Sequence, residues 1–355
     1  MVTYHTDTKD HAPIQLSTLS KWVSPSVLAW LQAAEATKIA RQAEIDEDDL
    51  TYTAALFQSE ADKQEELELQ QNRVQSWKTS VDNPDGEFNW LDNEHTNDAA
   101  DENSCEVRVI YIISDSTEGH GNTLWPSSRH VSNLLANKHS CSDVLSPLLQ
   151  QKKKVIDTTK HPLLGLSFVE FGAGAGVPSW TAMRCGARVV CTDQAVPDRI
   201  RCIAECAERN NKDLELLQSD GDILKNASLA RACPYNWGEC IDEVTSSLDN
   251  NEKFDVVVAA DCCYMPLLQT KLLQSIDMLM SQEGVALVPF ALHGNASDED
   301  VWKIVDRAKQ MGFVVEVLEP MQLTPSVIGM ADKQGLVQTV RLTRQLSHKN
   351  QLVVE

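Results

Sequence analysis

Hydrophobic residues are distributed differently in the first 105 residues and in the rest of the chain. Between Ser24 and Trp77, apolar residues such as Leu28 and Leu31 recur at helical spacing among Glu, Gln and Ala, which predicts a helical stretch. Residues 79–104 combine turn-forming and acidic residues without a period, which predicts a loop or disordered linker. We therefore expect residues 1–105 to form an acidic extension, partly helical and partly disordered, which the fold and the ligand site do not need.

From residue 106 the pattern becomes that of a compact α/β domain. Apolar runs that predict strands alternate with segments of helical period, and the strand at 254–261 is continuously apolar, as in a sheet buried on both faces. This alternation predicts a mostly parallel sheet with helices on both faces. The domain is predicted to span residues 106–347, followed by a tail at 348–355. Its other predicted strands are 107–113, 166–171, 187–193 and 284–292, and an antiparallel edge pair is predicted at 313–319 and 336–344. The predicted helices are 128–138, 178–186, 200–211 and 297–312.

One strand end is rich in glycine and is followed by an acidic residue on the next strand. The run Glu170-Phe171-Gly172-Ala173-Gly174-Ala175-Gly176 joins a strand to a helix, and glycine there lets the backbone approach a ligand. Asp193 ends the next strand, where a carboxylate can accept hydrogen bonds from both hydroxyls of a ribose. The dinucleotide fingerprint needs a third glycine at position 177, which is Val, and the Lys-Ser/Thr of a P-loop is absent. The pair predicts a nucleoside-type ligand.

Charge and cysteine content restrict the class of partner and the compartment. The net charge is −21, and most of the excess acid lies before residue 106, which argues against a general nucleic-acid binder and is compatible with a basic protein partner or a solvated extension. The ten cysteines include no CxxC pair, so we expect buried free thiols rather than a zinc site. No basic-then-apolar leader and no long apolar run occurs. We expect a cytoplasmic protein without a membrane segment, with the nucleus also open.

The glycine spacing resembles motif I of class I S-adenosylmethionine-dependent methyltransferases. Further segments are similar to the seven-strand protein-lysine methyltransferases of methyltransferase family 16, which include a nicotinamide-methyltransferase-like branch. The resemblance covers about residues 110–345 and implies a Rossmann-like fold with S-adenosylmethionine as cofactor. The N-terminal 105 residues and a long segment at 211–251 depart from the family pattern, so the substrate is implied less firmly than the cofactor. The similar segments are Leu124-Trp125-Pro126, residues 191–200, Tyr235-Asn236-Trp237-Gly238 and Asp261-Cys262-Cys263-Tyr264.

The resemblance also implies roles for individual residues. Trp237 would lie near the adenine, where an indole can stack on a purine, and Asp220 and Asp222 remain alternatives for that contact. Asp261 and Tyr264 would be catalytic, and no metal is needed. The D-x-x-Y segment lacks the prolines of the D/N-P-P-Y motif, which argues against methylation of nucleic-acid bases. The implied cofactor contacts are Trp125, Glu170, Gly172, Ala173, Gly174, Asp193, Trp237 and Ala260.

Three functions are compatible with these residues. The resemblance favours an N-methyltransferase that acts on a protein lysine or an N-terminal amine. The second is a methyltransferase for a small amine such as a pyridine, and the third is a cofactor-binding interaction protein without turnover, whose acidic N-terminal helix is the main functional element. An open acidic mouth would favour a protein substrate, whereas a closed apolar pocket would favour a small molecule. The sequence determines neither the methylated residue nor the oligomeric state.

Overall fold

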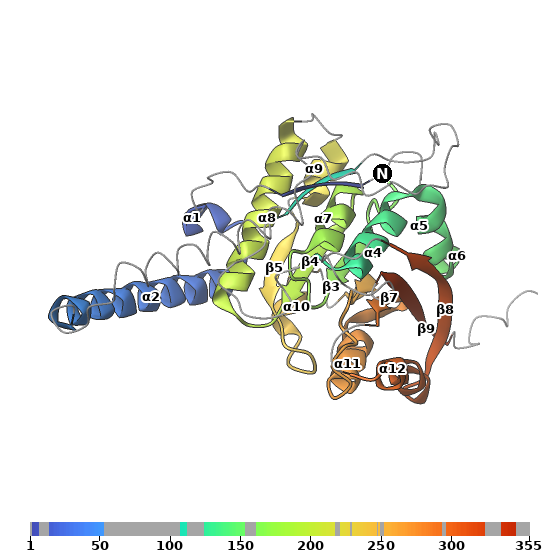
Figure 1. Ribbon diagram of the computed structural model, residues 1–355. Helices are drawn as coiled ribbons and strands as arrows, with labels where there is room; N and C mark the ends of the chain where they lie inside the picture. Colours follow the sequence, from blue (N-terminus) through green and yellow to red (C-terminus); the bar gives the residue numbers. More distant parts are fainter. Residues whose placement is uncertain are drawn as a thin grey trace, which may run out of the picture.

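A seven-stranded sheet forms the centre of the computed structural model (Figure 1). Its strands run in the order β5-β4-β3-β6-β7-β9-β8; β5, β4, β3, β6 and β7 are parallel, and β9 is antiparallel to both β7 and β8. The predicted Rossmann-like sheet with an antiparallel edge pair is confirmed. The strands are β3 (Ser167–Glu170), β4 (Arg188–Asp193), β5 (Arg231–Pro234), β6 (Phe254–Val258), β7 (Met280–Ala291), β8 (Phe313–Gln322) and β9 (Leu336–Arg344). The structure describes residues 2–6, 14–52, 107–111, 124–152, 161–216, 221–227, 229–246, 248, 252–292, 296–323 and 335–345.

Two layers of helices bury the two faces of the sheet. Successive residues of β6 enter opposite cores, because side chains alternate between the faces of a strand: Val256 and Val258 pack in the core that contains α4, α7 and α8, and Val257 packs in the core that contains α11 and α12. This double burial explains the continuously apolar run. The helices are α4 (Pro126–Ala136), α5 (Lys138–Val144), α6 (Ser146–Lys152), α7 (Val177–Arg184), α8 (Pro197–Leu216), α9 (Gly221–Ala227), α10 (Asp242–Thr245), α11 (Gln269–Leu279) and α12 (Asp298–Gln310).

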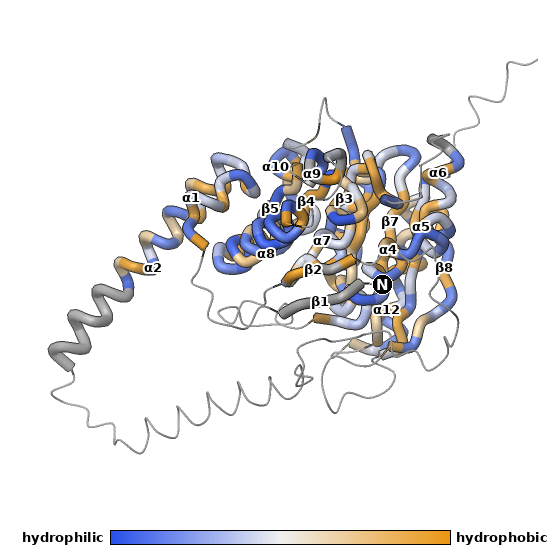
Figure 2. Tube along the Cα trace, turned by 90° about the horizontal axis from the view of Figure 1, so that it is seen from above, coloured by the Kyte–Doolittle hydropathy of each residue, from blue (hydrophilic) through white to orange (hydrophobic). Residues whose placement is uncertain are grey.

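The start of the chain packs on the sheet domain. Strand β1 (Val2–Thr6) pairs in parallel with β2 (Val107–Tyr111) in a separate two-stranded sheet, and α1 (Leu16–Leu19) and α2 (Pro25–Tyr52) follow. The predicted helix is thus confirmed over 25–52, whereas 53–77 and 79–104 lie outside the described residues. Beyond its first turns, α2 leaves the body of the molecule (Figure 2).

Tryptophan 22 joins this N-terminal segment to α8. Trp22 is 1% exposed, and its Nε1 donates to Glu208 Oε2 at 2.7 Å, while Leu19, Val27 and Leu31 are buried in the same core. Lys21 also forms an ion pair with Glu208 at 2.8 Å. These contacts argue against the expectation that the fold does without residues 1–105, which a shortened protein would test. No helix within the described ranges is long and apolar enough to cross a membrane.

Candidate functional site

A cavity of about 230 Å³ lies beyond the carboxyl ends of β3, β4 and β6. It is lined by every residue that the sequence predicted for the site except Glu170. Asp220 and the side chain of Asp222, the alternatives for the adenine contact, lie outside the part of the chain that the structure describes. The lining also includes residues that sequence reasoning missed, among them Ser128, Gln194, Arg199, Glu239, Met265, Leu268 and Lys271.

The glycine loop after β3 adopts a backbone that other residues disfavour. Gly172, Gly174 and Gly176 have φ values of +58°, +55° and +69°, in the left-handed region. A Cβ atom at Gly172 would lie 2.8 Å from Cys262 Sγ and 3.3 Å from Trp237 Cζ2, so a side chain there would force its neighbours to shift. The loop therefore lies directly against the segments that contain Cys262 and Trp237, and its bare backbone forms part of the cavity wall.

Asp193 faces this loop from the end of β4 and is 3% exposed. Its Oδ2 accepts from Gly174 N at 2.7 Å, and its Oδ1 accepts from Gln194 N at 2.7 Å and from Arg199 Nη1 at 3.0 Å. A carboxylate offers about four acceptor sites, so these three donors leave about one for a ligand hydroxyl. Arg199, from the first turns of α8, thus shares the carboxylate that the sequence assigned to a ribose alone.

Glu170, which the sequence predicted as a cofactor contact, is not among the residues that line the cavity. It is 1% exposed, and its Oε2 accepts from Ser179 N at 2.9 Å and from Ser179 Oγ at 2.5 Å. Because side chains alternate along a strand, Glu170 shares the face of Phe168, which packs in the core with α7. Burial raises the pKa of Glu170 to about 8. Its carboxyl group therefore ties the start of α7 to β3.

The D-x-x-Y segment lines the cavity next to the glycine loop. Asp261 has a φ of +54°, the one positive value at a non-glycine residue within the described ranges. Its Oδ1 accepts from Ala291 N at 3.2 Å, and its Oδ2 accepts from Ser127 Oγ, in the first turn of α4. The Trp-Pro-Ser and Asp-x-x-Tyr segments, whose bonded residues are 134 positions apart, are thus brought together by the fold. The second half of this pair, Ser127, was missed because nothing local in the sequence points to it.

Tyr264 lines the cavity three residues after Asp261. Burial raises the pKa of its phenol above the usual value, with nearby acidic groups acting in the same direction. The hydroxyl therefore keeps its proton at neutral pH and can donate a hydrogen bond to a ligand.

The cysteines near the site are thiols. All nine cysteines among the described residues are free, and seven are buried, which confirms that interpretation. Cys262 Sγ donates to Phe171 O at 3.2 Å beneath the glycine loop. In the part of the chain that the structure describes, no group of three or more His, Cys, Asp or Glu side chains is arranged to hold a metal ion.

Comparisons with known proteins show which chains this one is similar to. The chain is similar to the protein N-terminal and lysine N-methyltransferase EFM7 of Candida glabrata, at 29% identity over 169 residues, which are 47% of this chain and 62% of that protein. It is also similar to the mouse protein-lysine methyltransferase METTL21E, at 25% identity over 58% of this chain and 68% of that protein. Among solved structures, magnesium protoporphyrin IX methyltransferase from Synechocystis with bound SAH aligns at a TM-score of 0.35 and 12% identity, covering 59% of this chain and 83% of that one.

The chain spans less than two thirds of the Candida protein that it matches. The model of the lysine methyltransferase family matches residues 105–305, from β2 into α12. This range holds the glycine loop, Asp193, Trp237 and the D-x-x-Y segment, and it is more than half of the 355 residues. The chain therefore belongs to the lysine methyltransferase family.

Proposed function

We propose that this protein transfers a methyl group from S-adenosylmethionine to an amine nitrogen of a protein, either a lysine side chain or the N-terminal amine. The observation that carries the proposal is that one cavity is lined by the glycine loop, Asp193 and Trp237 together with Asp261 and Tyr264. In the proposed site the first group forms the cofactor end and the second group forms the substrate end. The similarity to EFM7 and METTL21E, whose names describe methylation of proteins, supports the same substrate class. A cytoplasmic or nuclear location remains a prediction.

The residues at one end of the cavity fit the cofactor. Gly172 and Gly174 line the cavity with bare backbone, which a ligand can approach closely, and a Cβ atom at Gly172 would lie only 2.8 Å from Cys262 Sγ. Asp193 would hold the ribose with its remaining acceptor site, and the indole of Trp237 would cover the adenine and exclude water. Trp125 and Ala260 would complete the wall. When bound, the cofactor supplies an electrophilic methyl group, and that chemistry requires no metal.

The residues at the other end fit an amine. A lysine with a pKa near 10.4 must lose its proton first, which at neutral pH costs about 4–5 kcal/mol. Asp261, held on both oxygens, is suited to orient the nitrogen and to accept its proton, directly or through water. Tyr264, which stays protonated, can donate a hydrogen bond or present its ring to the cation. A dry pocket favours the neutral amine over the ammonium.

The charges that line the cavity favour a cationic substrate. Arg199 forms an ion pair with Asp193 at 3.0 Å, so these two charges offset each other. The other charged residues of the lining are two acids, Glu239 and Asp261, and one base, Lys271. Glu239 is exposed and lines the cavity, so its carboxylate adds to the negative charge that a cationic substrate meets there. This excess of acid supports a protein amine over a neutral small molecule.

The test is incubation of the full chain with tritiated S-adenosylmethionine and a size-fractionated cell lysate, with Asp261→Asn as a matched variant. We expect label in the protein fraction, recovered after hydrolysis as a methylated lysine or N-terminal residue, and far less label with the variant. Label confined to the small-molecule fraction would favour methylation of a small amine. Cofactor binding by calorimetry without label in any fraction would favour an interaction protein without turnover.

A further inference from the structure

Tyr264 and Met265 form one wall of the cavity, on a loop between β6 and α11. Within this loop, Leu268 N donates to Met265 O at 2.9 Å, which closes a single turn. A short turn of this kind does not by itself fix its position relative to the glycine loop across the cavity. The position of Tyr264 therefore depends on the contacts that the loop makes on the side facing away from the cavity.

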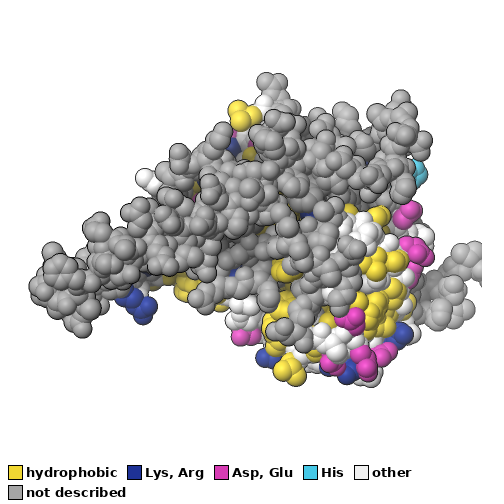
Figure 3. Space-filling model, viewed as in Figure 1, with side chains coloured by type: hydrophobic (Ala, Val, Ile, Leu, Met, Phe, Trp, Pro, Cys, Tyr) yellow, Lys and Arg dark blue, Asp and Glu magenta, His cyan; other side chains and the backbone are white. Residues whose placement is uncertain are grey.

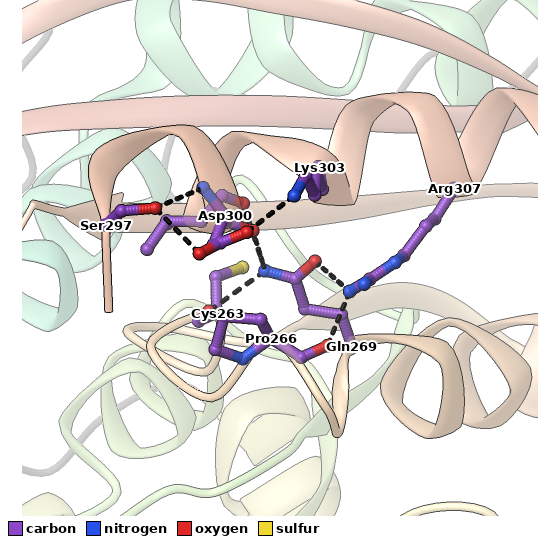
Figure 4. A network of polar contacts seen from close by, with 8 residues as sticks. Cys263, Pro266, Gln269, Ser297, Asp300, Lys303 and Arg307 are labelled. Carbon is purple, nitrogen blue, oxygen red and sulfur yellow. Dashed lines mark hydrogen bonds and ion pairs between the residues drawn. The ribbon is translucent and has the colours of Figure 1, made fainter. Parts of the chain in front are cut away.

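Gln269, the first residue of α11, holds the loop from that side (Figure 4). Its side chain is fully buried, and Nε2 donates to Cys263 O at 3.0 Å, to Val301 O at 3.0 Å and to Asp300 O at 3.2 Å. One amide group thus connects the carbonyl preceding Tyr264 to the first turn of α12. A buried amide with these partners is costly to displace, because its donors would lose their acceptors.

Arg307 completes the connection from the last turn of α12. Its Nη1 donates to Gln269 Oε1 at 2.6 Å and to Pro266 O at 2.5 Å. The guanidinium therefore fixes the orientation of the Gln269 amide and also binds the loop directly, one residue after Met265. Figure 4 shows both residues pointing into the space between the loop and α12, while Lys303 lies outside and bonds to Asp300.

Helix α12 contributes no residue to the cavity lining in the described structure. Its outer surface is charged: Figure 3 shows acidic and basic side chains mixed along the lower rim, where Figure 1 places α11 and α12. The helix begins at the Ser297 cap, whose Oγ accepts from Asp300 N at 3.1 Å, so its start is fixed locally. Gln269 and Arg307 thus connect α12, which lies outside the cavity, to the loop that forms the cavity wall.

We propose that Gln269 and Arg307 are positioning residues for the substrate side of the cavity. They hold the Cys263–Pro266 backbone so that Tyr264 and Met265 face the glycine loop at the spacing that methyl transfer needs. The assignment of the substrate side rests on the proposed function. That these two side chains fix the loop rests on their hydrogen bonds alone.

The experiment compares the full-length protein with Arg307→Met, Arg307→Lys and Lys303→Ala by hydrogen exchange. Lys303→Ala is the matched control, because Lys303 lies on the same helix and bonds only on its outer side to Asp300. We expect Arg307→Met to increase deuterium uptake in the peptide 262–268, Arg307→Lys to reverse much of that increase, and the control to match the wild type. Unchanged uptake in 262–268 for Arg307→Met would overturn the proposal.

Two binding and activity measurements separate positioning from general damage. We expect Arg307→Met to keep its affinity for S-adenosylhomocysteine within about twofold and to slow label transfer to the lysate protein fraction about tenfold, the effect of two lost hydrogen bonds on alignment. An equal loss of affinity and transfer would overturn the positioning role. If Arg307→Met does not fold, Gln269→Asn, which shortens the amide by one methylene, replaces it. If the wild type transfers no label, the proposed function fails, whereas the exchange comparison still tests the connection.

Discussion

The two ends of the cavity are built in different ways. At the cofactor end, formed by Gly172–Gly176 and Asp193, the bonded partners are close in sequence: Gly174 and Asp193 are 19 positions apart, and Arg199 lies six positions beyond Asp193. At the substrate end, formed by residues 261–268, Asp261 is bound by Ser127 from 134 positions away, and Pro266 by Arg307 from 41 positions away. One end is specified by a local βα pattern, and the other depends on the assembled tertiary structure.

This difference predicts that changes at the two ends have separable effects. Under the proposed function, contacts at the cofactor end act on binding of the nucleoside, before any chemistry. Contacts at the substrate end would then act on alignment of the amine, which is worth most in the transition state. Variants at the cofactor end should therefore change affinity, and variants at the substrate end should change turnover.

The largest effect is expected at Asp261. Asp261→Asn keeps the shape and tolerates the left-handed backbone, but it removes the carboxylate charge. We expect turnover to fall by about 10²–10⁴, the usual contribution of a positioned acid–base group, with affinity for S-adenosylhomocysteine nearly unchanged. The control is Asp255→Asn at the other end of β6, where Asp255 accepts from Ser167 N at 3.1 Å. Full methyl transfer by Asp261→Asn would reduce the residue to a structural one, and joint loss of binding would break the division between the two ends.

Asp193 provides the matching test at the cofactor end. Asp193→Ala should weaken cofactor binding by about 1–3 kcal/mol, because the hydroxyl loses a charged acceptor and Gly174 N loses its partner. Calorimetry with S-adenosylhomocysteine measures this directly. Asp198→Ala, which removes a half-buried carboxylate five positions later on α8, is the control and should bind normally. Unchanged affinity in a folded Asp193→Ala would contradict the assignment.

A smaller effect is expected at Ser127. Ser127→Ala removes one hydrogen bond to Asp261, so we expect transfer to slow by about fivefold, corresponding to about 1 kcal/mol, with unchanged cofactor affinity. Ser132→Ala, which removes a hydroxyl bonded to Ser128 O at 2.7 Å on the same helix, is the control. If both variants behave alike, Ser127 stabilises α4 and does not position Asp261.

The smallest effect concerns pH and Glu170. An unfolded glutamic acid loses its proton near pH 4.5, whereas folded Glu170 keeps its proton up to about pH 8. Between these values the folded state binds more protons than the unfolded state, so stability falls as pH rises. Gln cannot ionise, so the stability of Glu170→Gln does not have this pH dependence. The Tm of the variant minus the Tm of the wild type should therefore rise by a few degrees from pH 5 to pH 8 and stay constant above pH 8. A constant difference across that range, measured by scanning fluorimetry beside Glu299→Gln, would refute the assignment.

The elements that could be predicted are those whose pattern is local. Val256, Val257 and Val258 are all apolar because β6 is buried on both faces, and the glycines identify the loop because their backbone excludes other residues. Strand β5 was missed because it has only four residues, of which two are buried. Its place in the sheet comes from backbone pairing with β4, which leaves little trace in the side chains.

The same distinction between local patterns and tertiary contacts applies to the site residues. The alternation of side chains along β3 places Glu170 on the face of Phe168, so the burial of Glu170 could be predicted from the sequence. Helix α11 was missed although Leu272, Leu273, Ile276 and Leu279 recur at helical spacing and are buried. In contrast, the contact between Ser127 and Asp261 has no local signal, because only the packing of α4 across the sheet brings the two side chains together.

The N-terminal segment has a consequence for the solution behaviour of the protein. Strand β5 is the terminal strand of the sheet, and Ala232 N donates to Trp22 O at 2.6 Å while Arg231 Nη1 donates to Lys21 O at 3.0 Å. The backbone of Lys21 and Trp22 therefore occupies part of an edge that would otherwise be free to pair with the edge of another molecule. A protein shortened to residue 106 would keep every cavity residue and still expose this edge, so its first failure would be self-association.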